Sequence, residues 1–221
     1  MRRMILAAGV AVMLAATGGA AFARQAQRAP TASPAATDQQ VVTEAYAAFQ
    51  SGRYAALTPR LGALQAVLAR APAGSRSDIY PSAALMLGSY AVEYRRYDEA
   101  VRVLERGLTF QPDNVSLLME RGQAFLGLRR PADALGSFEA ALSSRQMDAR
   151  DVRSRALRAR GVALIDLHRL DDAEASLNAS LRLDPNNAAT QNELQYIAGL
   201  RRGGNASPAD VPQNGGTPSK G

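Results

Sequence analysis

Residues 81–114 read PSAALMLGSYAVEYRRYDEAVRVLERGLTFQPDN, and this stretch decides the fold. It places Gly88, Ala100 and Pro112 at equal intervals along the chain. The pattern recurs in two later copies, one that contains Gly122 with Ala134, and one that contains Gly161 with Ala173 and Pro185. A period of about 34 residues predicts stacked pairs of helices.

The recurring positions have packing roles that follow from their size. A glycine inside a helix costs about 1 kcal/mol relative to alanine, so three glycines in register indicate close contact between helices. The alanines supply a second small surface in the second helix of each pair. One turn after each alanine comes a large side chain that we expect to fill the space, namely Leu104, Phe138 and Leu177.

These residues resemble the tetratricopeptide repeat, a 34-residue helix–turn–helix with a pattern close to W-x2-L-G-x2-Y…A-x3-F…P. The first unit has Leu87-Gly88, then Ala100-x3-Leu104, then Pro112, and the second has Gln146 where proline is usual. The resemblance implies an all-α fold, a right-handed α-solenoid of helical hairpins with a C-terminal capping helix. It also implies a concave groove, lined by the first helices, that binds extended peptides or partner proteins.

The repeats divide the chain into segments. We expect a degenerate hairpin of the tetratricopeptide type at 38–71, complete repeats at 81–114, 115–148 and 154–187, and a capping helix at 188–202. Residues 149–153 are an insertion between the last two repeats. Asn114 and Asn187 each follow a proline-containing stop and are expected to cap the next helix, and Pro131 suits a first helical position.

The two ends of the chain differ from the repeats in amino-acid composition and do not contain the repeat pattern. Residues 1–23 have the basic start, apolar run and Ala21-Phe22-Ala23 site of a signal peptide, and 24–37 form a flexible linker. We expect an exported, periplasmic protein cleaved after Ala23, similar to bacterial periplasmic tetratricopeptide proteins. An uncleaved N-terminus that anchors the chain in the inner membrane is the alternative. Residues 203–221 are rich in Gly, Pro and Asn and predict a disordered tail.

Composition argues against several function classes. The chain has no cysteine, which excludes disulfides, thiolate chemistry and a lipid-modified cysteine. The formal charge is +6, and every basic residue except Lys220 is arginine, which does not indicate a nucleic-acid partner in an exported chain. His168 is the single histidine, too few for the usual zinc sites. We therefore expect no catalytic residues, no metal, no cofactor and no enzymatic activity.

The candidate binding residues lie on the stripe of the first helices that adjoins the packing stripe. The stripe is expected to be aromatic and apolar at its N-terminal end, small and polar in the middle, and basic at its C-terminal end. The residues predicted to line the groove are Tyr46, Phe49, Ser82, Leu85, Ser89, Glu93, Met119, Gln123, Arg155, Arg158, Asn192 and Tyr196.

The basic end of this stripe has two interpretations. Arg155 and Arg158 are close enough in sequence to project from one helix face, where they suit a carboxylate of the partner. The alternative is a solvated basic face of an arginine-rich protein. The two-lysine, two-asparagine carboxylate clamp of chaperone-binding tetratricopeptide domains is not matched.

The sequence therefore predicts a protein–protein interaction scaffold of the cell envelope. It would bind an extended peptide or a partner protein in the concave groove, with assembly of an envelope complex as a candidate role. Two alternatives stay open: a self-associating structural module that forms homo-oligomers, and an accessory subunit of an envelope enzyme or secretion system.

Overall fold

The structure is a computed structural model that describes the backbone of residues 34–202 and the side chains of residues 37–202. The chain divides into two units, residues 1–37 and 38–221, and the second unit contains the repeats. The predicted signal peptide, the predicted tail and most of the predicted linker lie outside the described residues.

The described residues are helical and contain no strand, so the predicted all-α class is confirmed. The first predicted hairpin corresponds to an α-helix followed by a 3-10 helix and a short α-helix. The elements are α2 (Pro34–Gln50), η1 (Tyr54–Arg60), α3 (Leu61–Arg70), α4 (Ile79–Glu93), α5 (Tyr97–Leu108), α6 (Val115–Gly127), α7 (Pro131–Ser143), α8 (Arg150–Asp166), α9 (Leu170–Leu183) and α10 (Ala188–Arg201).

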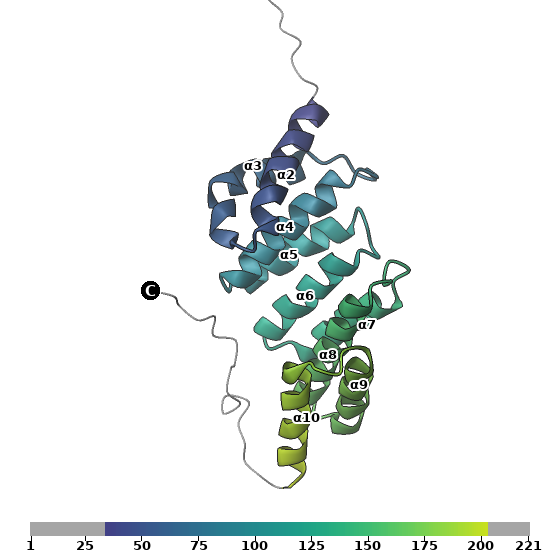
Figure 1. Cartoon of the computed structure of the whole chain (residues 1–221). Helices are drawn as coiled ribbons and strands as arrows, with labels where there is room; N and C mark the ends of the chain where they lie inside the picture. The colour runs from purple at the N-terminus through teal and green to yellow at the C-terminus, as the bar shows by residue number, and fades with distance from the viewer. Residues whose placement is uncertain (1–33, 203–221) are drawn as a thin grey trace, which may run out of the picture. The chain divides into compact units, whose positions relative to one another are not determined.

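Consecutive helices form hairpins that stack in chain order, as Figure 1 shows. Helix α4 pairs with α5, α6 with α7, and α8 with α9. Each second helix also packs on the next first helix, and the first helices α4, α6 and α8 contact one another in series. Helix α10 packs on α9 and α8. This is the predicted right-handed solenoid with a capping helix.

The repeated glycines lie where two helices of a hairpin approach most closely. A Cβ atom on Gly88 of α4 would lie 2.4 Å from Cδ2 of Leu104 in α5, and one on Gly161 of α8 would lie 2.7 Å from Cδ2 of Leu177 in α9. Both leucines are completely buried. The predicted close contact at the glycines is therefore confirmed.

The turn inside each complete hairpin contains a residue in the left-handed backbone conformation, which the sequence analysis did not predict. Arg95, Arg129 and His168 each have a φ of 57°, and each follows the repeated glycine of its hairpin at the same offset. After Arg95, the Arg96 N–H donates to the Ala91 carbonyl at 2.7 Å, and the other two turns repeat this bond. The bond closes a Schellman motif, which ends each first helix with one left-handed residue.

The predicted helix caps are confirmed. The Asn114 side chain accepts a hydrogen bond from the Leu117 N–H at 3.1 Å, and the Asn187 side chain accepts one from the Thr190 N–H at 3.0 Å. Pro131 occupies the first turn of α7. The inserted residues 150–153 lengthen α8 at its N-terminus, so the break in the period falls within a helix.

Candidate functional site

The candidate site is the surface carried by the first helices, which we call the first-helix face: the exposed and half-buried side chains of α4, α6, α8 and α10. These helices contact one another in series, so their side chains form one continuous surface. The second helices α5, α7 and α9 carry the opposite surface of the hairpins (Figure 1).

The predicted groove residues differ in how far they reach solvent. Glu93, Gln123 and Arg155 are exposed, whereas Ser89 is buried. Leu85 and Met119 are half-buried and pack against the core, so they contribute to stability as well as to the surface. The other half-buried members are Ser82, Arg158, Asn192 and Tyr196.

An aromatic row carried by α2 and η1 adjoins the N-terminal end of the first-helix face. The Tyr46 and Phe49 ring centroids lie 6.2 Å apart, and the Phe49 and Tyr54 centroids lie 5.9 Å apart in an edge-to-face arrangement. Tyr46 is 44% exposed, which is unusual for a large side chain in the described residues. Tyr54 was not among the predicted site residues; it joins the row because η1 follows α2 after a tight turn.

Glu120 of α6 is a second residue that sequence reasoning missed. Burial raises the pKa of its carboxyl above the ordinary value, while Ser89 and Arg155 act in the opposite direction. The equivalent positions of the neighbouring repeats hold Met86 and Ala159, both buried. Glu120 is therefore an acidic residue at a position where the neighbouring repeats have apolar residues. Aligning the repeats with one another would have identified it.

Three polar side chains converge beside the aromatic row. Burial raises the pKa of the Tyr54 phenol, and the charges of Glu120 and Glu93 raise it further, so both carboxylates lie near this ring. Ser89 is only 2% exposed. Its hydroxyl makes no hydrogen bond of standard geometry within the described part of the chain, although it lies near enough to Glu120 to favour the charged carboxylate.

The C-terminal end of the first-helix face has mixed charge, which corrects the expectation of a basic end. Burial raises the pKa of the Glu193 carboxyl, Arg158 lowers it and Asp166 raises it again. Arg158 therefore faces a carboxylate of α10, which the spacing within α8 did not reveal. Arg155 lies 3.8 Å from Asp151 in an exposed ion pair, a contact that contributes little.

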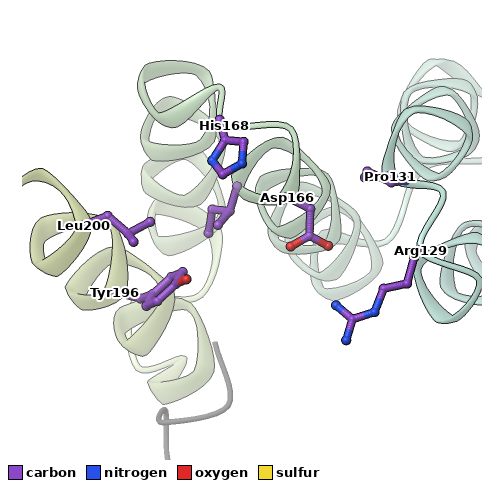
Figure 2. A pocket seen from close by; sticks show the side chains of 7 residues that line it. Arg129, Pro131, Asp166, His168, Tyr196 and Leu200 are labelled. Atoms are coloured by element: carbon purple, nitrogen blue, oxygen red, sulfur yellow. The ribbon is translucent and has the colours of Figure 1, made fainter. Parts of the chain in front are cut away.

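A pocket of about 350 Å³ opens at this end, between the turn after α6, the end of α8 and α10. Figure 2 shows Asp166 with Arg129 on one side and Tyr196 on the other. Burial raises the pKa of the Asp166 carboxyl, and the charges of Arg129 and His168 oppose that rise. The pocket is lined by Arg129, Pro131, Ile165, Asp166, His168, Tyr196 and Leu200.

The described residues offer no group of three or more potential metal ligands. Within residues 34–202, moreover, every helix is too short or too polar to cross a bilayer.

Comparisons with known proteins agree with the geometry. The tetratricopeptide repeat family matches residues 85–149 and 119–188. RNA polymerase II-associated protein 3 of Xenopus laevis is 32% identical over 125 residues, which make up 57% of this chain and only 18% of that protein. The first tetratricopeptide domain of human RPAP3 is 28% identical, with a TM-score of 0.50 over 56% of this chain and 95% of that domain.

MamA of Desulfovibrio magneticus RS-1 covers more of the solenoid, 75% of this chain and 85% of its own, with a TM-score of 0.60 and 17% identity. At that identity the likeness concerns the fold alone. The tetratricopeptide fold is a protein-interaction scaffold. Residues 85–188 of this chain are therefore tetratricopeptide repeats.

Proposed function

We propose that this chain is an interaction scaffold that holds an extended segment of a partner protein on the first-helix face. The pocket at the end of α8 carries the proposal. It combines a carboxylate, Asp166, with apolar and aromatic walls from Leu200 and Tyr196. Ligand sites commonly pair an apolar lining with a few converging polar groups in this way.

The size of the pocket limits what it accepts. A volume of about 350 Å³ suits one or two side chains of a longer ligand. The exposed Gln123 and Glu93 lie on earlier first helices of the same face, where an extended segment would run past them. Recognition along several helices, with one side chain seated in the pocket, is therefore the binding mode that fits the surface best.

We also propose that the protein acts in the cell envelope, where it would help an envelope complex to assemble. Arg2 and Arg3, the apolar run after them and the site ending at Ala23 support export. The proposal predicts that protein from a bacterial periplasmic extract begins at Arg24. An intact N-terminus in the membrane fraction would instead support the anchored alternative.

The binding mode is tested with a library of random 12-residue peptides, selected on the immobilised chain from Arg24 onward. Bound peptides are synthesised and their affinities are measured against the Gln123→Trp variant. Gln123 is exposed on α6, so the indole would fill the first-helix face without entering the core. We expect the affinity to fall at least tenfold.

A matched variant, Gln65→Trp, makes the same change at an exposed position of α3, away from the first-helix face. It should leave the affinity unchanged. Peptides that respond to Gln65→Trp and ignore Gln123→Trp would contradict the proposed binding surface, as would a library that yields no binder.

A further inference from the structure

At the N-terminal end of the first-helix face, carboxylates of α4 and α6 lie near aromatic rings of α2 and η1. We call this group the acidic–aromatic cluster: Phe49, Tyr54, Ser89, Glu93 and Glu120. The residues come from α2, η1, α4 and α6, so the fold rather than the local sequence brings them together. Phe49 and Tyr54 meet edge to face at 5.9 Å, and the charges of both glutamates act on the Tyr54 phenol.

The cluster contains two carboxylates, Glu93 and Glu120, and neither has a positively charged partner within 4 Å among the described residues. Glu120 is half-buried, and burial raises the pKa of its carboxyl. The Ser89 hydroxyl, 2% exposed and without a hydrogen bond of standard geometry, faces the same carboxylate. A hydroxyl can donate only one hydrogen, so the two carboxylates keep acceptor oxygens available for donors from outside the chain.

The position of Glu120 argues against a purely structural role. The neighbouring repeats show that Met86 and Ala159 fill the same column with buried apolar side chains. Burying a carboxylate there costs stability, because its charged form loses hydration. Charges held in such places cluster at functional sites.

We propose that the acidic–aromatic cluster binds the cationic side chain of an arginine or lysine in the partner segment. The inference rests on the proposed function, because it names what that segment presents to the first-helix face. A guanidinium or ammonium group supplies several N–H donors at once, enough for the Glu120 and Glu93 carboxylates and the Ser89 hydroxyl. The faces of Phe49 and Tyr54 attract the same positive charge.

The positive charges of the protein itself do not prevent a cationic side chain from binding in the acidic–aromatic cluster. Arg155 lies near Glu120 but outside ion-pair distance, and its guanidinium pairs with Asp151 at 3.8 Å. The formal charge of the chain is +6, yet salt screens exposed charges beyond about 8 Å at physiological ionic strength. The local field of two carboxylates therefore decides what binds in the cluster.

The test begins with the selected 12-residue peptides whose affinity falls with Gln123→Trp, since these bind the first-helix face. Each arginine in them is replaced by citrulline, which has nearly the same shape and no charge, and each lysine by norleucine. At one recurring basic position we expect the replacement to weaken binding to the wild-type protein at least tenfold. The same replacement should weaken binding to the Glu120→Gln variant less than threefold, because this variant has already lost the attraction between the Glu120 carboxylate and the basic side chain of the peptide.

Two further variants keep the test decisive. Glu105→Gln makes the same chemical change on the exposed surface of α5 and should bind like the wild type. Glu93→Gln, at an exposed position of the cluster, tests the inference without disturbing the core if Glu120→Gln fails to fold.

Peptides that bind the first-helix face without a recurring basic residue would overturn the inference and leave the proposed function standing. Equal losses on citrulline replacement in the wild type and both cluster variants would overturn it as well. A library without any peptide sensitive to Gln123→Trp would overturn the proposed function and this inference together.

Discussion

A Cβ atom on Gly122 of α6 would lie 2.3 Å from Cε1 of Phe138 in α7. Phe138 is completely buried, so its ring cannot swing aside into solvent. Contacts this short do not occur between real side chains, and the hairpin must therefore have glycine at this position. Gly88 with Leu104 and Gly161 with Leu177 repeat the relationship in the hairpins on either side.

The first prediction concerns this contact. Gly122→Ala should lower the free energy of unfolding by about 3 kcal/mol, because the added methyl group overpacks a core that cannot yield. Gly136→Ala is the control: Gly136 lies in α7 with no atom within 4 Å of a built Cβ. That change should raise stability by about 0.8 kcal/mol through helix propensity alone. Urea unfolding followed by circular dichroism measures both, and a loss of stability at position 136 would contradict the account.

The second prediction concerns the left-handed turn residue Arg95, whose side chain is exposed. Holding a non-glycine residue in this conformation costs about 1–2 kcal/mol. Arg95→Gly should therefore raise the free energy of unfolding by about 0.5 kcal/mol after the entropy of a glycine in the unfolded chain is subtracted. Arg102→Gly, exposed inside α5, should lower it by about 1 kcal/mol. If both variants lose stability equally, the turn conformation is wrong.

The third prediction is a pH dependence at Glu120. Because burial raises the pKa of this carboxyl in the folded state, the folded chain binds the proton more tightly than the unfolded chain does. The stabilising contribution of the protonated form is thus complete below the ordinary pKa of about 4.3 and is lost as the pH rises through the raised value. At pH 7 the charged side chain destabilises the fold.

Glu120→Gln should consequently be more stable than the wild type at pH 7, by on the order of 1 kcal/mol. The advantage should shrink as the pH falls and vanish below about pH 4, where both side chains are neutral. Unfolding curves at a series of pH values measure the difference, and Glu105→Gln should show no such trend. An advantage that grows toward acid would mean that Glu120 is stabilised as an anion.

A fourth prediction separates the two interpretations of Arg155. If this arginine grips a carboxylate of the partner, Arg155→Ala should weaken binding of the selected peptides. If the acidic–aromatic cluster binds a basic side chain, removal of this nearby positive charge should strengthen binding about two- to threefold at low salt. Titration calorimetry at low and high salt distinguishes the outcomes, because the gain should fade as salt is added.

The hairpins were predictable because their signals are local and repeated. Each glycine faces a large side chain at a fixed offset in the next helix, as Gly122 faces Phe138, and the repeat shows this pairing in every complete hairpin. The asparagine caps were equally predictable, since Asn114 bonds to the backbone N–H of Leu117 in the first turn of the helix that it caps. Such features need no knowledge of the tertiary fold.

The turn residues were not predictable from their own chemistry. A left-handed residue after a helix is usually glycine, but Arg95, Arg129 and His168 occupy this place here. The hydrogen bonds of the Schellman motif and the packing of the following helix hold the conformation. The conformational preferences of arginine and histidine therefore did not predict the left-handed backbone at these positions.

The site was predictable as a surface but not as a set of interactions. The helical stripe placed Gln123 and Arg155 on the exposed first-helix face. It missed Glu120, which lay outside the predicted stripe and whose equivalents in the neighbouring repeats, Met86 and Ala159, are buried apolar residues. The environment of Arg158 depends on Glu193 of α10, whose charge only the tertiary fold brings near α8.

The central claim, that the first-helix face holds a partner protein, is tested most directly by site-specific photo-crosslinking in living cells. A benzophenone amino acid replaces Gln123 on α6 in one strain and Gln65 on α3 in another, both at exposed positions. We predict that illumination joins position 123, and not position 65, to a segment of one partner protein, identified by mass spectrometry of the crosslinked peptide. Adducts formed only from position 65, or adducts at 123 that contain only a second copy of this chain, would contradict the claim.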